Sequence, residues 1–461
     1  MPKNQAFPTK FVAPLYMGAT FNSINSSLIA TALVAIATFM EVPAAQATVL
    51  VTVFYLASAI AQPTAGKLAE VFGPRRIFIG GIVLVFFGGL LGGLGQDMPM
   101  LTASRLLIGL GASASYPAAM TLIRRRADSA GLSEPPSNVL GMLQIAASVT
   151  SVVGLPLGGA LVGLWGWRTA FWINVPFTAI AFLMAFFWVP KDMPSQKGKS
   201  LKEVYAELDV TGIVGFAAMM TALLVFLFTL PRLSWAPLAL AVLFGAFMAW
   251  WELRNKNPFI DIRLLAKDMA LTRVYLRFSG LTLCVFTIIY GLTQWLEVVK
   301  GLDPAITGLL VVPMSLVSTV LAWLVSRKNM VRAALLIAVL FSIAGSAGLF
   351  FLSAASPLAL VVLVTVLFGV SMGTMAIGNQ TALYALAPAS QIGTASGLLR
   401  TFGYIGSIAS SAMINLVFQE SVSDPGLHAL AIIMIVAGVL VLLLTVTDRW
   451  VMTSAKDKKA S

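Results

Sequence analysis

Charged and metal-binding side chains are scarce in this sequence. Asp, Glu, Lys and Arg together make up 10% of its 461 residues, against about 25% in an average soluble domain. The one cysteine, Cys284, cannot form an internal disulfide, and the one histidine, His428, cannot supply a His-rich metal site. We therefore expect no disulfide, no metal and no cofactor.

Apolar residues dominate the composition instead. They make up 59% of the chain, and the mean hydropathy is +0.92. Too few polar side chains remain to coat a compact globule of this length in water. One helical span needs about 20 apolar residues, so fourteen spans would use roughly 280. The composition predicts an all-α, multi-pass membrane protein.

Fourteen apolar runs, bounded by charges, proline or glycine, follow one another in groups of six, two and six. They lie at about 11–40, 46–66, 77–96, 100–123, 138–163, 169–190, 209–230, 235–253, 271–298, 305–326, 333–353, 357–386, 391–418 and 427–448. If 209–253 is a single re-entrant piece, twelve true spans remain. We prefer fourteen, because each of these two runs is long enough to cross a membrane.

The basic residues predict the orientation of the chain. With the N-terminus inside, the runs Arg75-Arg76, 124–126 and Arg327-Lys328 all fall on the cytoplasmic side. The Lys and Arg residues left elsewhere are Arg168, Arg232 and Lys300 outside, and Arg105 and Arg400 within spans. This bias matches the positive-inside rule and predicts two cytoplasmic termini. It also accounts for the net charge of +12 without a nucleic-acid partner.

The same pattern predicts how the chain is divided. We expect a six-helix bundle over 1–190, a linker with a transmembrane hairpin and an amphipathic loop over 191–270, a second six-helix bundle over 271–449 and a cytoplasmic tail over 450–461. Within 254–270, apolar residues alternate with charged ones, which favours a short amphipathic segment on the cytoplasmic face. An ordinary connecting loop fits that stretch equally well.

Motifs for catalysis and nucleotide binding are missing. We find no His/Asp/Glu cluster, Ser/His pair, metal-ligand spacing or phosphate-binding Gly-Lys loop in the sequence. We therefore expect no enzyme, and no nucleotide-driven pump unless a partner chain supplies the ATPase.

The loop after the second apolar run carries the first mechanical motif. Residues 66–76 read Gly-Lys-Leu-Ala-Glu-Val-Phe-Gly-Pro-Arg-Arg. The glycines Gly66 and Gly73 allow two helix ends to approach closely, and Glu70 beside Arg75 and Arg76 can form a charge-assisted latch between helices. A latch that is made and broken suits alternating access, whereas a plain basic turn is the simpler interpretation.

This loop resembles the signature that the major facilitator superfamily carries between helices 2 and 3, where the acid is usually Asp. Further stretches resemble the fourteen-span drug/proton antiporters of that superfamily. They are residues 165–168 and 171–176 around helix 6, Asp209 before the extra hairpin, 257–261 before the ninth span, 301–313 at the tenth and 393–398 at the thirteenth. The resemblance implies two six-helix bundles with an inserted hairpin.

Span 4 begins with Arg105 in an Arg-x-x-x-Gly-x-Gly pattern. A charge within an apolar span costs at least about 2.5 kcal/mol, so this arginine should face a polar cavity or a partner. The resemblance ties it to proton coupling; snorkelling to the nearby outer surface is the alternative.

Span 5 contains Gly154, Pro156, Gly158 and Gly159. These residues resemble the antiporter motif of helix 5, with the proline one residue later, which turns the kink by about 100° around the helix. Ordinary close packing of a glycine- and proline-containing membrane helix is the alternative.

Span 1 departs from the antiporter pattern. The resemblance implies an Asp where this chain has Asn25, which can bond a substrate but cannot take up or release a proton near neutral pH. None of the 18 acids lies near the middle of a predicted span. The best remaining candidate for coupling is Glu297 near the outer end of span 9, although an interfacial charge beside Lys300 is the simpler interpretation.

Polar residues within spans predict where a substrate would bind, because side chains of this kind are costly against lipid. The candidates are Asn22, Asn25, Gln62, Gln144, Tyr290, Gln294, Asn379, Gln380, Arg400 and Tyr404. Asn25 lies nearest the middle of a span. For any one of them, an interhelical hydrogen bond that only stabilises the bundle is an equally good interpretation.

We therefore expect a monomeric transporter in the plasma (inner) membrane that exports small amphipathic compounds, drugs or metabolites, by alternating access. With two basic groups and no deep acid inside spans, neutral or weakly anionic substrates fit the charges better than cations. The resemblance implies coupling to protons, whereas Asn25 and the position of the acids favour an uncoupled facilitator or a lipid translocator.

Overall fold

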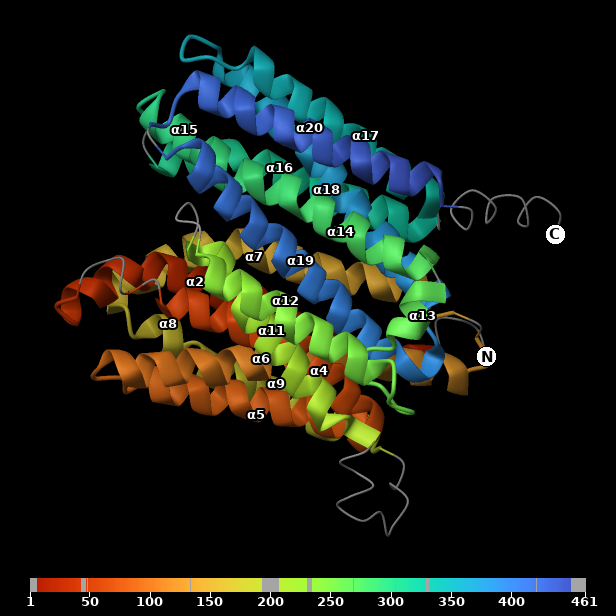
Figure 1. Cartoon of the computed structure of the whole chain (residues 1–461). Helices are drawn as coiled ribbons and strands as arrows, with labels where there is room; N and C mark the ends of the chain where they lie inside the picture. The colour runs from red at the N-terminus through yellow and green to blue at the C-terminus, as the bar shows by residue number, and fades with distance from the viewer. Residues whose placement is uncertain are drawn as a thin grey trace. The chain divides into compact units, whose positions relative to one another are not determined.

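The computed structural model describes residues 6–42, 47, 49–132, 134–192, 207–229, 234–267, 269–302, 304–328, 331–419 and 421–448. Throughout these ranges the regular structure is helical, and no strand occurs in them (Figure 1). Residues 193–206, in the first part of the predicted linker region 191–270, and the whole tail 450–461 lie outside the described residues.

The helices follow the predicted apolar runs closely. They are α2 (Thr9–Phe39), α4 (Val49–Phe72), α5 (Pro74–Gly93), α6 (Met98–Ser129), α7 (Ser137–Trp165), α8 (Thr169–Trp172), α9 (Asn174–Trp188), α11 (Val210–Thr229), α12 (Trp235–Glu252), α13 (Ile262–Lys267), α14 (Met269–Thr287), the π-helix η1 (Ile288–Leu292), α15 (Thr293–Val298), α16 (Pro304–Lys328), α17 (Val331–Gly348), the 3₁₀ turn η2 (Leu349–Phe351), α18 (Leu358–Leu386), the 3₁₀ turn η3 (Ala389–Gln391), α19 (Ile392–Val417) and α20 (Asp424–Val446).

Eleven helices in the described ranges are long and apolar enough to cross a membrane. A twelfth is added if Thr9–Ile29 and Thr31–Phe39, which meet at a 41° bend, form one span. The apolar part of α7 that could contribute is the shorter Ser137–Ala147, and α19 is not among the eleven. The helical membrane architecture is confirmed, while the count of fourteen and the side of the termini stay predictions.

Local sequence explains where several helices begin and end. The Oδ1 atom of Asp97 accepts a hydrogen bond from the Met100 amide at 2.8 Å and so caps the start of α6. Gly73, at φ 102°, precedes Pro74 and lets α5 start directly after α4. Gly166, at φ 83°, ends α7.

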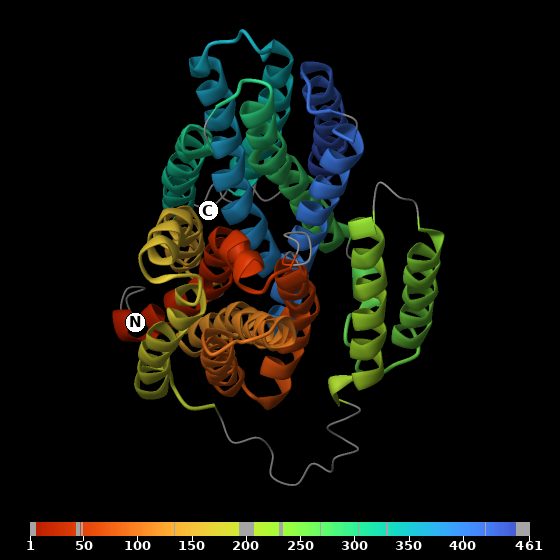
Figure 2. The same ribbon diagram turned by 90° about the vertical axis from the view of Figure 1, so that its left-hand side faces the viewer.

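The described residues form two compact units. Unit 1 consists of Met1–Met220, Met248–Asp261 and Ala387–Thr401, and unit 2 consists of Thr221–Phe247, Ile262–Leu386 and Phe402–Ser461. In unit 1, α6 packs against α4 and α5, and α2 packs against α7; in unit 2, α18 packs against α14, α16 and α17 (Figure 2). The bundle boundaries predicted from the sequence stay a prediction.

Small residues explain why α6 lies in the interior of unit 1. A Cβ at Gly109 would contact Ala57 and Phe54 of α4, and one at Gly111 would overlap the carbonyl oxygen of Gly81 on α5. Backbones can approach this closely only where side chains are absent, which is how helices associate in lipid.

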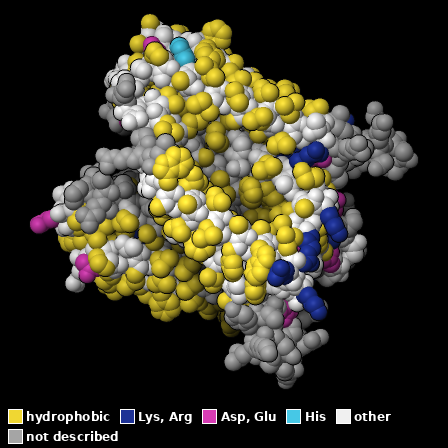
Figure 3. Space-filling view, viewed as in Figure 1, with side chains coloured by type: hydrophobic (Ala, Val, Ile, Leu, Met, Phe, Trp, Pro, Cys, Tyr) yellow, Lys and Arg dark blue, Asp and Glu magenta, His cyan; other side chains and the backbone are white. Residues whose placement is uncertain are grey.

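Large apolar side chains cover the outside of the helices. Leu164, Phe187, Leu309 and Phe351 expose 70 to 72% of their surface, and Figure 3 shows hydrophobic side chains over much of the visible face. An apolar surface of this extent is expected of helices that face lipid.

Two carboxylates tie the ends of helices together in unit 2. Asp448, just after α20, bonds Arg277 of α14 at 3.0 Å, and both side chains are at most 1% exposed. Asp424, at the start of α20, accepts the indole N–H of Trp295 at 2.9 Å and the amide of Ala354 at 3.1 Å. These bonds connect α20 to α14, to α15 and to the loop before α18.

Candidate functional site

Glu70 was expected to form a latch with the arginines of its own loop, but in the structure it bonds the start of α19 within unit 1. Oε1 of Glu70 accepts the Thr394 amide at 2.8 Å, and Oε2 accepts the Thr394 hydroxyl at 3.1 Å. Thr394 lies in the first turn of α19, where backbone N–H groups are unpaired and the helix dipole favours an anion. Glu70 therefore binds a helix N-terminus, and we call this contact the latch.

A seam of glycines allows the latch to close. A Cβ at Gly66 would overlap the backbone carbonyl of Gly393, and one at Gly397 would overlap that of Gln62. Farther along the seam, the Thr401 hydroxyl donates to the Ala59 carbonyl at 2.8 Å. The two backbones are thus in direct contact beside Glu70.

The two arginines of the same loop contact a different acid. Asp192 accepts the amides of Arg75 and Arg76 at 3.1 and 2.9 Å, at the N-terminus of α5. Arg125 approaches the same carboxylate at 3.9 Å. Gly73 leaves room for this arrangement, because a Cβ there would overlap the Asp192 carboxyl. Among the described contacts, Glu70 thus bonds Thr394, whereas Asp192 accepts the backbone amides of Arg75 and Arg76.

A second group of polar side chains lies buried in unit 1. Asn25 donates to the side-chain carbonyl of Asn174 at 2.8 Å and to the Phe21 carbonyl at 2.9 Å. Arg105 donates to the carbonyls of Leu50 at 3.1 Å and Asn25 at 3.4 Å. Asn25, Asn174 and Arg105 are each 1% exposed, so Arg105 does not snorkel to the surface.

The charge of Arg105 is compensated without a carboxylate in the described part of the chain. Its guanidinium lies 4.3 Å from the centre of the Phe54 ring, a cation–π contact. Its hydrogen bonds go to carbonyl oxygens, and Nη2 has no hydrogen-bond partner among the described residues. The group of Asn25, Asn174 and Arg105 therefore presents positive charge and neutral amides but no acid.

Arg400 belongs to a third group in unit 1. Its Nη2 donates to Oε1 of Gln144 at 3.1 Å, and its guanidinium lies 4.0 Å from the centre of the Tyr116 ring. Gln62, on α4, is 2% exposed. Asn22 donates to the Ser113 hydroxyl at 3.3 Å. Five of the ten predicted binding residues thus lie in unit 1, namely Asn22, Asn25, Gln62, Gln144 and Arg400.

The other five lie in unit 2. Tyr290 sits in the π-helix η1, a local widening that often marks functional positions. Asn379 and Gln380 are buried in α18, where Asn379 donates to the Met375 carbonyl at 2.9 Å. Tyr404 on α19 is half-buried, and Gln294 is exposed.

Glu297, the predicted coupling acid, is exposed on α15 of unit 2. Its neighbour Lys300 donates to the carbonyls of Ala354 at 2.9 Å and Ser356 at 2.6 Å. Glu297 thus lies exposed at the end of a helix and not buried among helices. Its role in coupling stays a prediction.

The glycines of the predicted helix 5 motif face α2. A Cβ at Gly154 would lie 2.7 Å from Ser27, and one at Gly158 would lie 2.7 Å from the Thr31 hydroxyl. Gly159 points to open space, and the side chain of Pro156 lies outside what the structure describes. Gly154 and Gly158 thus act as packing residues between α2 and α7.

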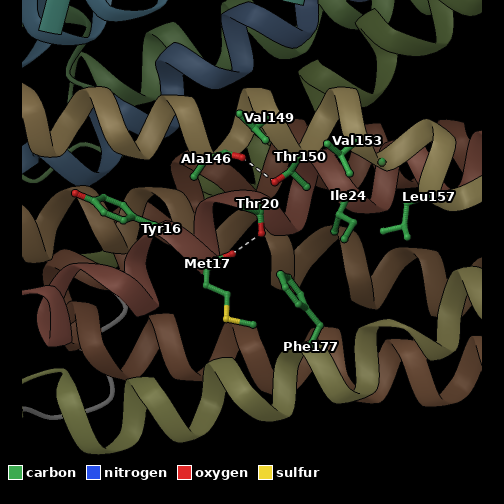
Figure 4. A pocket seen from close by; sticks show the side chains of 11 residues that line it. Tyr16, Met17, Thr20, Ile24, Ala146, Val149, Thr150, Val153, Leu157 and Phe177 are labelled. Atoms are coloured by element: carbon green, nitrogen blue, oxygen red, sulfur yellow. Dashed lines mark hydrogen bonds between the residues drawn. The ribbon is translucent and has the colours of Figure 1, made fainter. Parts of the chain in front are cut away.

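An open cavity of about 390 Å³ lies beside this contact in unit 1 (Figure 4). Its walls come from α2, α7 and α9, and the residues are Tyr16, Met17, Thr20, Ile24, Ala146, Val149, Thr150, Val153, Gly154, Leu157 and Phe177. The hydroxyls of Thr20 and Thr150 donate to carbonyls of their own helices, Met17 and Ala146, at 2.7 Å. The lining is therefore almost wholly apolar, and it suits an oily rather than a charged group.

Sequence reasoning missed several residues that complete these groups. Asn174, Tyr116, Asp192 and Thr394 are partners of predicted residues but were not predicted themselves. Asn174 and Thr394 do lie in stretches that resemble known motifs, which was the available signal. Nothing in the local sequence marks Tyr116 or Asp192, because their partners are distant in the chain.

Comparisons with known proteins all point to one family of transporters. The sequence model of the Major Facilitator Superfamily matches residues 15–411. The MFS-type transporter YwoD of Bacillus subtilis is 31% identical, over 96% of this chain and 98% of its own length. The tetracenomycin C resistance and export protein of Streptomyces glaucescens is 25% identical, over 88% and 75%.

A solved structure has the same fold. The crystal structure of the human organic anion transporter MFSD10 superimposes with a TM-score of 0.66, covering 96% of this chain and 100% of the other, at 16% identity. At that identity the likeness concerns the fold alone.

Proposed function

The chain belongs to the Major Facilitator Superfamily, and from this premise we propose that it exports small amphipathic compounds across the membrane by alternating access. Membership makes it a transporter rather than an enzyme. The direction and the kind of compound are our proposal, which is supported by a relative that is itself a resistance and export protein.

The latch is the observation that carries the proposal. Glu70 holds the α19 N-terminus with two hydrogen bonds, and the glycine seam beside it is in backbone contact. Hydrogen bonds to a charged group each contribute about 1.5–3 kcal/mol. A contact of this strength is stable in one state and can still be broken in another, as alternating access requires.

The cavity and the buried polar side chains of unit 1 support an amphipathic substrate that is neutral or weakly anionic. Its cavity is apolar, and its buried polar group consists of two amides and the Arg105 guanidinium. An apolar body with a neutral or weakly anionic polar group fits these surroundings better than a cation does.

Replacing Glu70 with glutamine tests the latch. The substitution keeps the size of the side chain but removes the negative charge that the α19 N-terminus favours. We expect transport to fall about tenfold or more, because the closed latch loses at least one charge-assisted bond of about 1.5 kcal/mol. Uptake of Nile red, a neutral amphipathic dye, into everted vesicles and proteoliposomes with and without a pH gradient measures this.

The matched control for that variant is Glu134→Gln, on an exposed residue before α7. It should transport at the rate of the parent protein. An unchanged rate in the Glu70 variant would contradict the role of the latch, and dye movement that ignores the pH gradient would remove proton antiport from the proposal.

An uncoupled facilitator is the second candidate, favoured by Asn25. This residue lies beside Arg105 and bonds Asn174, and an amide there cannot carry a proton. If the protein is a facilitator, gradient-independent transport should become pH-dependent in Asn25→Asp, by up to about tenfold per pH unit, the limit for one ionisable group.

The control for this second test is Asn138→Asp, at an exposed position at the start of α7. It should leave the pH profile flat. If the Asn25 variant keeps a flat profile as well, position 25 lies outside the transport pathway.

A further inference from the structure

Two buried carboxyl groups face each other at the base of the α11–α12 hairpin. Asp209 precedes α11 and Glu252 ends α12, and they are 2% and 1% exposed. An oxygen of each, Oδ2 of Asp209 and Oε1 of Glu252, lies beside the Cα of Gly212. A Cβ at Gly212 would overlap oxygens of both, so a glycine is required between them.

The hydrogen bonds show that the two carboxyls are not equivalent. Asp209 accepts the Trp251 indole N–H at 2.7 Å, the Phe259 amide at 3.0 Å and the Gly212 amide at 3.1 Å. Three N–H donors are what an ionised carboxylate prefers. The backbone of Asp209 is at φ 53°, an unusual conformation that aims its carboxyl at all three donors.

Glu252 has fewer donors. Its Oε1 accepts the Ile260 amide at 3.2 Å, while Oε2 is buried with no hydrogen-bond partner among the described residues. Two ionised carboxyls in contact within a buried site repel each other strongly. One proton shared by the pair removes that repulsion and supplies the bond between them.

No cation replaces this proton in the described part of the chain. The charged residues on the surrounding segments are Lys67, Glu207, Arg254, Lys256 and Asp261. Lys67 bonds the Pro258 carbonyl at 3.0 Å and Arg254 lies over the Trp250 ring. Neither Asp209 nor Glu252 forms an ion pair with a described residue.

The pair also holds the segment that follows the hairpin. Residues 255–261 cross from α12 toward α4, and the amides of Phe259 and Ile260 are the ones bound by the two carboxyls. Phe259 is buried against Phe216 of α11, with ring centres 5.6 Å apart. Lys67, three residues before the latch acid Glu70, holds the carbonyl of Pro258. We call Asp209, Glu252 and residues 255–261 the clasp.

We propose that Asp209 and Glu252 form a binding site for one proton, that this proton closes the clasp, and that the closed clasp connects the hairpin to α4 through Lys67. Loss of the proton leaves two negative charges in one buried site. Glu252 then moves away, and the Ile260 amide loses its acceptor. The proposal concerns the chain itself and does not depend on which compound it transports.

Infrared spectroscopy of the purified full-length protein in lipid nanodiscs, without any transported compound, tests the shared proton. We expect a protonated-carboxyl band at neutral pH that shifts in D₂O and is lost in Glu252→Gln. The glutamine side chain keeps an acceptor for the Ile260 amide and offers an N–H to Asp209, so it imitates the protonated acid and should keep the fold.

The control is Asp424→Asn. Asp424 also accepts one tryptophan indole and one backbone amide, but it bonds no second carboxyl among the described residues, and its replacement should leave the band unchanged. A spectrum of Glu252→Gln identical to that of the parent protein, or no such band in the parent protein, would overturn the proposal.

Hydrogen exchange of residues 255–261 tests the clasp, after correction for the intrinsic effect of pH on exchange. In the parent protein we expect the Phe259 and Ile260 amides to exchange at least about tenfold faster at alkaline than at neutral pH. In Glu252→Gln the protection should persist. The same pH dependence in both proteins would show that the proton does not close the clasp. Neither measurement involves transport, so failure here is distinct from failure of the export proposal.

Discussion

Replacing Gly66 with alanine is expected to reduce transport by about 5- to 150-fold while the protein still folds. A Cβ at this position would overlap the backbone of Gly393, and neither backbone can move aside as a flexible side chain could. Overpacking of this kind costs about 1–3 kcal/mol, which corresponds to that range in an equilibrium between two states. The cost falls on the state in which the latch is closed.

The measurement is dye transport in proteoliposomes, together with thermal unfolding of the purified variant. Gly80→Ala is the matched control, because Gly80 lies on α5 of the same unit and a Cβ there meets nothing within 4 Å. If both variants transport at the parental rate, the α4–α19 seam does not need to close during the cycle. If Gly66→Ala fails to fold, the seam is part of the core rather than a latch.

Replacing Asp448 with alanine is expected to lower the free energy of unfolding by about 3–5 kcal/mol. The change leaves Arg277 buried and without the carboxylate that it now contacts at 3.0 Å. Its Nε and Nη1 atoms already have no hydrogen-bond partner among the described residues, so the lost bond has no local substitute. Unfolding of the detergent-solubilised protein by denaturant measures this difference.

A double replacement separates the charge from the packing. Arg277→Met combined with Asp448→Leu removes both charges, and such exchanges are often neutral or stabilising by about 1–4 kcal/mol. The pair Arg124–Asp128, at 3.1 Å, provides the control because the Asp128 side chain is exposed: Asp128→Asn should change stability by less than about 1 kcal/mol. Equal effects of Asp448→Ala and Asp128→Asn would contradict the importance of burial.

The helices were predictable because their signal is local. An apolar run of about 20 residues has few alternatives to a membrane helix, since the backbone must satisfy its hydrogen bonds within the segment. The run 100–123, for example, lies within α6, and 357–386 coincides with α18 to within one residue. Breaks such as the π-helix at Ile288–Leu292 depend on packing and have no comparable signal.

The candidate site was predictable only in part. Glu70 and its glycines stand in a continuous motif, and Asn25 and Arg105 are conspicuous because polar groups within spans are rare. Their partners were not predictable in the same way: Glu70 bonds Thr394, 324 positions away, and Asn25 bonds Asn174, 149 positions away. The expectation that Glu70 and the arginines form one latch was natural from their proximity in sequence.

The sequence by itself determined that this chain is a helical membrane protein, because composition and the length of the apolar runs leave few other structures possible in lipid. That it is a transporter was implied by the motifs that resemble those of a known family. Only the tertiary structure decided which acid holds which helix end, that Arg105 is buried without a carboxylate among the described residues, and that Asp209 and Glu252 share one site. These pairings arise from contacts between segments far apart in the chain. A buried polar group must find a partner, but its own sequence neighbours do not specify which one.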